Sequence, residues 1–247
     1  MTRRPDITPQ LLRTRVMAIL RSDESSGLPA VARALAAGGI TCLEITLTTP
    51  GALDALARIR EELGSGVAVG AGTVVTPGQA RDALSAGAEF LVAPGVDTAV
   101  IGDAARRGTP CYPGAWTPTE VTTAWQAGAA AVKLFPASTG GPAHLRQLRA
   151  PLPHIPLVAV GGVGVTQARA FLDAGARAVG LGSPLLRGAD RDPTPEALDR
   201  LADRARTLLE AVNATAPEPA PESAPESAPE LAPESAPEPA PKKEAGS

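Results

Sequence analysis

The clearest candidate for chemistry is a lysine inside an apolar run. The first 214 residues contain twenty arginines and a single lysine, Lys133, which stands between Val132 and Leu134. Arginine keeps its charge in proteins, whereas a lysine amine in an apolar environment can lose its proton and attack a carbonyl carbon. This usage predicts a nucleophilic amine at Lys133. The alternative is a lysine that only forms an ion pair with a buried acid.

A second candidate is a carboxylate in the apolar run CLEITL, residues 42–47. Side chains alternate along a strand, so Glu44 and Thr46 lie on one face and the leucines and isoleucine lie on the other. The wholly apolar face should pack against helices, which turns Glu44 and Thr46 inward, and the same alternation turns Lys133 inward. Because a nearby carboxylate would raise the lysine pKa, we expect burial to outweigh this attraction, or substrate or water to separate the two groups.

Glycine-rich turns follow two later strand-like runs. Gly161 and Gly162 end one run, and Gly182 and Ser183 end the next. Bare backbone N–H groups at such turns bind phosphate in many barrels, so we expect a phosphate site there, although tight turns also use these residues.

Three more residues end strand-like runs and could reach a substrate. Arg21 ends the first run and could bind a carboxylate or phosphate, or form a surface ion pair. Thr73 has the same parity as the valines of the run at residues 67–73, and Pro94 follows another run. Turn chemistry is the alternative for Thr73 and Pro94. The two histidines, His144 and His154, lack the spacing of metal ligands, so we expect no metal and no cofactor.

The elements that position these residues repeat along the chain. One phrase occurs four times: a helix-like run, then Ala-Gly, then a strand-like run. A glycine after a helix typically adopts the left-handed conformation and ends it. The four repeated glycines are Gly38, Gly87, Gly128 and Gly175.

Further strand-like runs bring the count to eight, each followed by a predicted helix. Three helix starts are marked by Thr-Pro pairs at Thr49, Thr76 and Thr117. Eight alternating units in about 200 residues predict a (β/α)8 TIM barrel. An open doubly wound sheet is the alternative, but no glycine-rich dinucleotide fingerprint follows the first run. The last helix is predicted over Pro195–Ala214.

Composition divides the chain into residues 1–214, the barrel, and residues 215–247, a Pro/Ala/Glu-rich stretch expected to be a disordered tail. Residues 1–214 carry 21 basic and 19 acidic side chains, which is too even a balance for a nucleic-acid surface. Cys42 and Cys111 lie in apolar runs and should be reduced. We find neither a secretion signal nor a membrane span in the sequence, so we expect a cytoplasmic protein without nucleic-acid or membrane partners.

Five short motifs in order resemble the 2-keto-3-deoxy-6-phosphogluconate (KDPG) aldolase family. They are LEITL with Glu44, GAGT ending at Thr73, APG at residues 93–95, KLFPAS from Lys133, and VGGV followed by LGS. The similarity spans about residues 11–212. It implies a metal-free class I barrel lyase, usually a homotrimer, that cleaves a phosphorylated 2-keto-3-deoxy acid into pyruvate and glyceraldehyde 3-phosphate.

The resemblance also implies roles for individual residues. Lys133 would form the Schiff base and Glu44 would move protons. Thr73 and Pro94 would line the pyruvate pocket, and the phosphate would be held by Gly161, Gly162, Gly182 and Ser183.

Departures from the gluconate-type pattern leave the substrate open. Thr48, Val160 and Ser138 replace an arginine, a threonine and a glutamate that such members often carry, and the differences resemble 2-keto-3-deoxy-6-phosphogalactonate aldolases. Cleavage of 4-hydroxy-2-oxoglutarate by the same lysine is another alternative. Two rivals use the barrel differently: a sugar-phosphate isomerase or epimerase with Glu44 as base, and a non-catalytic binding barrel.

Overall fold

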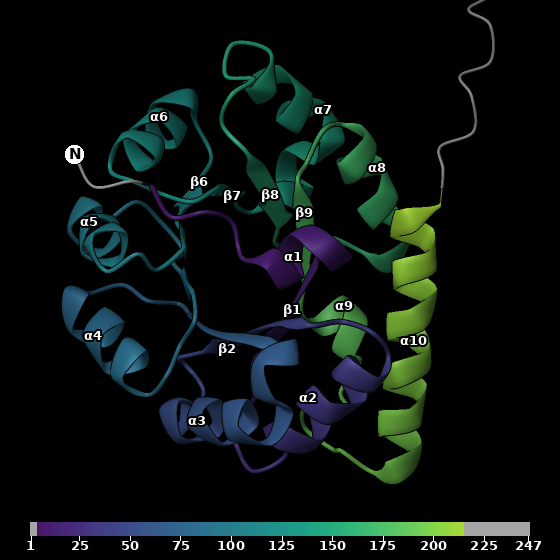
Figure 1. Ribbon diagram of the computed structural model, residues 1–247. Coiled ribbons are helices and arrows are strands. Elements are labelled where there is room, and N and C mark those ends of the chain that lie inside the picture. The colour runs from purple at the N-terminus through teal and green to yellow at the C-terminus, as the bar shows by residue number, and fades with distance from the viewer. Residues whose placement is uncertain (1–3, 215–247) are drawn as a thin grey trace, which may run out of the picture. The chain divides into compact units, whose positions relative to one another are not determined.

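The computed structural model describes residues 4–214, and their strands form one parallel sheet that closes almost completely into a barrel (Figure 1). The order in the sheet is β5-β4-β3-β2-β1-β9-β8-β7-β6. The strands are β1 (Val16–Leu20), β2 (Cys42–Thr46), β3 (Ala68–Gly72), β4 (Leu91–Val92), β5 (Cys111–Tyr112), β6 (Gly114–Ala115), β7 (Val132–Leu134), β8 (Leu157–Val160) and β9 (Ala178–Leu181).

The two strands at the ends of this sheet are consecutive in the chain. Only Pro113 separates β5 from β6, and proline has no N–H with which to continue the ladder. The carbonyl of Pro113 still accepts a hydrogen bond from the Lys133 N–H at 2.9 Å. β5 and β6 therefore make one barrel strand between β4 and β7. This gives eight strand positions and confirms the predicted (β/α)8 TIM barrel.

Helices surround the barrel and alternate with its strands (Figure 1). They are α1 (Pro9–Thr14), α2 (Leu28–Ala37), α3 (Ala52–Leu63), α4 (Pro77–Ser85), α5 (Thr98–Arg106), α6 (Pro118–Gln126), α7 (Ala137–Arg149), α8 (Ala168–Asp173), α9 (Ser183–Leu186) and α10 (Pro195–Asn213), with short 3-10 turns at Gly64–Gly66 and Val165–Gln167. The last helix begins at the predicted Pro195 and ends one residue earlier than predicted.

Two of the three predicted helix starts are confirmed. The Thr76 hydroxyl accepts the Gln79 N–H, and Thr117 forms a reciprocal capping box with Glu120. The prediction at Thr49 is wrong, because α3 begins at Ala52 after Gly51. The buried Thr49 hydroxyl instead accepts the N–H of Ser22 at 3.1 Å, which ties the end of β2 to the end of β1.

The repeated glycines end their helices as predicted in three of four cases. Gly87, Gly128 and Gly175 have φ values of 95°, 109° and 99°. Gly38 is right-handed, with φ −79°, and the next residue, Gly39, takes the left-handed conformation. The helix end there lies one residue further along than predicted. A Cβ at Gly38 would overlap the backbone of α10, so close helix packing explains this glycine.

Apolar side chains form two layers that follow the alternation along the strands. Leu43 and Ile45 belong to the larger cluster between strands and helices, whereas Cys42 belongs to a smaller one inside the barrel. Tyr112 also lies inside, and its hydroxyl accepts the N–H of Thr8 at 2.9 Å. The N-terminal segment thereby covers one end of the barrel, which α1 crosses in Figure 1.

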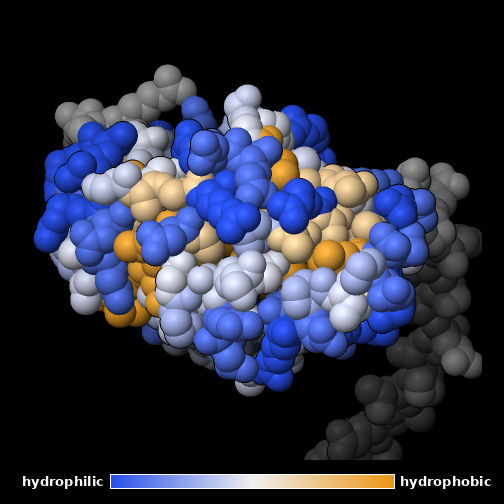
Figure 2. All heavy atoms as spheres, turned by 90° about the horizontal axis from the view of Figure 1, so that it is seen from below, coloured by the Kyte–Doolittle hydropathy of each residue, from blue (hydrophilic) through white to orange (hydrophobic). Residues whose placement is uncertain are grey.

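The surface of the barrel is mixed in character. In Figure 2, hydrophilic residues cover much of the visible side and hydrophobic residues show between them. Cys42 and Cys111 are buried free cysteines. Within residues 4–214, no helix is both long and apolar enough to cross a membrane. The predicted disordered tail, residues 215–247, lies outside the described residues.

Candidate active site

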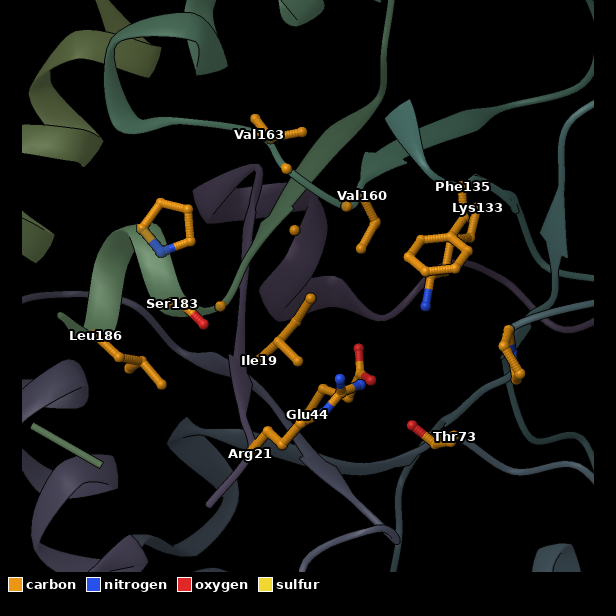
Figure 3. Close-up of a pocket in the computed structure, with 16 residues that line it drawn as sticks. Ile19, Arg21, Glu44, Thr73, Lys133, Phe135, Val160, Val163, Ser183 and Leu186 are labelled. Atoms are coloured by element: carbon orange, nitrogen blue, oxygen red, sulfur yellow. The ribbon is translucent and has the colours of Figure 1, made fainter. Parts of the chain in front are cut away.

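Lys133 and Glu44 lie on opposite walls of the barrel. Lys133 is the middle residue of β7 and Glu44 is the middle residue of β2, and four steps along the sheet order separate these strands. Their side chains point toward one another across a cavity (Figure 3). Both are buried, with 6% and 2% of their surface exposed. The inward orientation predicted for both residues is confirmed.

The cavity between them has a volume of about 390 Å³ and opens at the carboxyl ends of the strands. The structure brings all nine sequence-predicted site residues to it: Arg21, Glu44, Thr73, Pro94, Lys133, Gly161, Gly162, Gly182 and Ser183. Apolar side chains complete the wall. In barrel enzymes this end of the strands is where substrates bind.

A missing side chain makes room for Glu44. A Cβ on Gly72, the last residue of β3, would overlap the Glu44 carboxyl group. One carboxylate oxygen, Oε2, is buried and has no hydrogen-bond partner within residues 4–214. An unsatisfied buried acceptor is costly, so this oxygen is a natural partner for a group of a bound molecule.

Burial dominates the electrostatics of both groups. Desolvation lowers the pKa of Lys133, and the positive charge of Arg21 adds to this effect, whereas the charge of Glu44 opposes it. Desolvation likewise raises the pKa of Glu44, although Lys133 and Arg21 act in the opposite direction. These directions favour a neutral amine and a carboxyl group able to take and return a proton.

Lys133 and Glu44 are near enough to influence each other but do not form an ion pair. Among residues 4–214, no carboxylate oxygen lies within 4.0 Å of the Lys133 amine. The amine lies 4.6 Å from the centre of the Phe135 ring. This geometry removes the main support for a non-catalytic barrel held by a buried Lys–Glu pair.

Thr73 reaches the cavity by a route that strand alternation does not predict. Val67, Val69 and Ala71, which share its parity, belong to the outer apolar layer. β3 ends at Gly72, and Thr73 has a left-handed backbone with φ 59°. This conformation is strained for a threonine and turns its side chain toward the cavity (Figure 3).

The predicted phosphate site occupies the turns after β8 and β9. Gly161 and Gly162 have φ values of 93° and 71°, conformations that favour glycine. A Cβ at Gly161 would overlap the Phe135 ring, and one at Gly162 would overlap Ser138. Close packing as well as backbone conformation therefore requires glycine here. Gly182 precedes α9, which begins at Ser183.

Two other sequence-predicted positions differ in their surroundings. Arg21 is exposed at the rim, and its charge acts on both Glu44 and Lys133. Thr46 is fully buried but does not line the cavity. Its hydroxyl accepts a hydrogen bond from Thr48 at 3.2 Å and lies 3.4 Å from that of Thr49.

Sequence reasoning missed the apolar wall of the cavity. Ile19, Phe135, Val163, Pro184 and Leu186 line it and were not predicted. Strand alternation could have predicted two of them. Ile19 is two residues before Arg21 and Phe135 is two residues after Lys133, so each is on the same face as a predicted site residue. Val163, Pro184 and Leu186 lie in turns or in α9, where strand alternation gives no guide.

Neither histidine lines this cavity. The His144 ring stacks on Trp116 with centroids 4.2 Å apart, so it is half-buried in packing, whereas His154 is exposed. In the part of the chain that the structure describes, no three His, Cys, Asp or Glu side chains are grouped to hold a metal ion.

The barrel and this cavity fit an enzyme of the aldolase class, a carbon–carbon lyase. The model of the aldolase family described as KDPG and KHG aldolase matches residues 7–193, and the chain belongs to this family. KHG is 4-hydroxy-2-oxoglutarate.

Named relatives agree with this assignment. The 2-dehydro-3-deoxy-phosphogluconate aldolase of Treponema pallidum is 39% identical over 62% of this chain and 73% of its own. The 2-dehydro-3-deoxy-6-phosphogalactonate aldolase of Escherichia coli is 34% identical over 79% of this chain and 93% of its own. A crystal structure of KDPG aldolase from Legionella pneumophila, with pyruvate captured as a covalent carbinolamine intermediate, is 26% identical. It aligns with a TM-score of 0.72 over 82% of this chain and 98% of that one.

Proposed function

We propose that this protein cleaves 2-keto-3-deoxy-6-phosphogluconate to pyruvate and glyceraldehyde 3-phosphate through a Schiff base on Lys133. The observation that carries the proposal is the buried lysine amine, which has no ion pair among residues 4–214 and faces a buried carboxyl group across the cavity. A neutral amine attacks the C2 carbonyl carbon, and loss of water gives a protonated imine. The pyruvate carbinolamine in the Legionella pneumophila relative supports this step.

Bond cleavage then uses Glu44. The C3–C4 bond breaks and its electron pair moves toward the imine nitrogen, which gives an enamine. Glu44, directly or through one water, takes the proton of the C4 hydroxyl as the aldehyde forms. Glu44 then helps to protonate C3 of the enamine, and hydrolysis of the imine releases pyruvate and restores the lysine.

The remaining cavity residues bind the two ends of the substrate. The backbone at Gly161, Gly162 and Gly182, with the Ser183 hydroxyl, holds the phosphate. Thr73 and Pro94 line the pyruvate end, and Arg21 at the rim binds a substrate oxygen. This arrangement needs no metal and no cofactor.

Two close alternatives differ only in the substrate. Val160 contributes methyl groups to the cavity, and Thr48 and Ser138 also depart from the gluconate-type pattern. These residues favour the galactonate epimer as the first alternative, and 4-hydroxy-2-oxoglutarate is the second.

The test measures pyruvate release from the two phosphorylated epimers and from 4-hydroxy-2-oxoglutarate, for the full chain and for Lys133→Arg. We expect pyruvate release from at least one of the three substrates, and no release by Lys133→Arg because arginine cannot form the imine. The ranking of kcat/KM values identifies the preferred substrate. Substantial activity in Lys133→Arg would contradict the proposal and favour an isomerase or epimerase that uses Glu44 as base.

We also propose that the protein is a homotrimer in the cytoplasm, as expected for a member of this family. Light scattering of the purified full chain tests the assembly. A mass of three chains is expected, and a mass of one chain would contradict it.

A further inference from the structure

A second cavity lies at the opposite end of the barrel, where the strands begin and α1 crosses in Figure 1. We call it the N-terminal-end cavity, and its volume is about 710 Å³. Three arginines line it: Arg15 precedes β1, Arg149 ends α7, and Arg177 precedes β9. No Asp or Glu is among its lining residues. The cavity is therefore positively charged and separate from the catalytic one.

Among residues 4–214, none of these three arginines forms a salt bridge, since no carboxylate oxygen lies within 4.0 Å of the guanidinium groups of Arg15, Arg149 or Arg177. The neighbouring Asp173 pairs with Arg169 at 2.7 Å, and Asp6 lines an adjoining cavity beside Arg177. Burial, together with the charges of Arg169 and Arg177, lowers the pKa of Arg15, although Asp173 opposes this effect.

The backbone at Arg15 is strained in a way that a glycine would relieve. Arg15 ends α1 in the left-handed conformation with φ 58°. The chain uses glycine for this conformation at Gly87, Gly128 and Gly175, whereas Arg187 at the end of α9 also adopts it, with φ 48°. The left-handed conformation costs an arginine more free energy than a glycine. A binding role for the Arg15 charge accounts for the arginine at this position.

Arg149 is held against the wall of the cavity. Its guanidinium lies beside Gly175, where a Cβ would overlap it. It is half-buried, like Arg15. The rest of the wall includes apolar side chains, among them Ile155, Leu172 and Trp125. Arg177 is exposed, so the cavity is open to solvent on that side. The guanidinium fork suits the oxygens of phosphate groups, which it can contact through two parallel hydrogen bonds.

We propose that the N-terminal-end cavity binds a small anion that carries several phosphate charges. The inference rests on three arginines that line one cavity and have no carboxylate within 4.0 Å among residues 4–214, one of them at a strained backbone position. It is independent of the reaction proposed above, because the cavity lies at the other end of the strands.

Titration calorimetry with inorganic tripolyphosphate on the full chain tests the proposal. The double variant Arg149→Gln/Arg177→Gln should bind at least about tenfold more weakly, because two charge-assisted contacts are lost. Arg146→Gln is the matched control: Arg146 lies in the last turn of the same helix, is exposed and does not line the cavity. It should bind as the original chain does.

Pyruvate release by the double variant is measured in parallel and should be unchanged, which separates this cavity from the catalytic phosphate site. Equal affinity of the double variant and the original chain would overturn the proposal, as would no measurable binding by the original chain.

A second variant separates function from structure. Arg15→Gly relieves the backbone strain, so its melting temperature without anion should rise, while its affinity for tripolyphosphate should fall. If the melting temperature rises and the affinity stays the same, Arg15 does not contribute to an anion site and the proposal is wrong.

Discussion

At the scale of the residue, the surroundings of Lys133 and Glu44 act on two pKa values in opposite directions. Burial lowers the lysine pKa and raises that of the glutamate, while each charge moves the other group back toward its ordinary value. Arg21 favours loss of the proton from both groups. The pKa of Lys133 therefore depends on two neighbouring charges of opposite sign, and removing each charge should shift this pKa in the opposite direction.

Glu44→Gln and Arg21→Gln should move the titration of Lys133 in opposite directions. Removing the glutamate charge lowers the lysine pKa further, so pyruvate adduct formation should reach half its maximum at lower pH than in the original chain. Removing the arginine charge raises the lysine pKa, so this midpoint should move to higher pH. The rate of borohydride-trapped adduct formation is measured against pH for all three proteins.

Glu44→Gln should also reduce turnover by about 10²- to 10⁴-fold, the usual contribution of a general acid–base group. A midpoint that moves the same way in both variants would contradict the assigned electrostatics. Unchanged turnover in Glu44→Gln would remove the proton-transfer role.

At the scale of the element, strand alternation predicted the orientation of the reactive side chains. It turned Glu44 and Lys133 inward because both lie in the middle of strands, where the period of two is regular. It failed at Thr73, which lies beyond the last residue of its strand and has a left-handed backbone. It also gave no guide to Val163, which lies in a turn, or to Leu186, which lies in α9, because a period of two does not apply there.

Turn chemistry was predictable where the cap is local and failed where tertiary contacts compete. Thr117 caps its helix through residues three positions away, a signal that the sequence contains. Thr49 instead bonds to Ser22, which is 27 residues distant, and the helix begins later. Gly38 likewise is explained by close packing against α10, a tertiary contact, and not by a local helix-ending conformation.

Gly72→Ala should displace the carboxyl group of Glu44. The added Cβ would occupy its space, so we expect a large loss of kcat and a destabilisation of about 1–3 kcal/mol from overpacking. Turnover and thermal unfolding are measured together. Gly66→Ala is the control, since a Cβ there meets no atom within 4 Å.

Adduct formation at Lys133 should persist in Gly72→Ala, because the lysine lies on the opposite wall. A variant with normal kcat would show that the position of the Glu44 carboxyl group beside Gly72 does not matter for turnover.

At the scale of the whole molecule, the barrel explains how residues from distant segments meet. Parallel strands bring their carboxyl ends to one edge, so side chains and turns from strands spread over much of the chain line one cavity. The repeated helix–glycine–strand phrase was sufficient to predict this architecture. The sequence did not predict that Pro113 would divide one barrel strand into β5 and β6. Proline lacks the N–H that would continue the ladder, but the chain keeps its course on both sides of it.

A chain ending at Ala214 should turn over substrate as fast as the full chain. All residues that the structure describes as lining the catalytic cavity lie before this point, and residues 215–247 have the composition of a stretch that cannot form a core. Steady-state kinetics of the two proteins are compared. A large loss of kcat/KM in the shorter chain would show that residues 215–247 take part in catalysis.

The central claim is imine formation at Lys133, and borohydride reduction in the presence of pyruvate tests it most directly. Intact mass and peptide mapping identify the modified residue, and the map is simple because the chain has only Lys133 and the two lysines at 242 and 243. The account predicts one reduced pyruvyl adduct, on the peptide that contains Lys133. A folded protein without an adduct, or with an adduct only at residues 242–243, would contradict it.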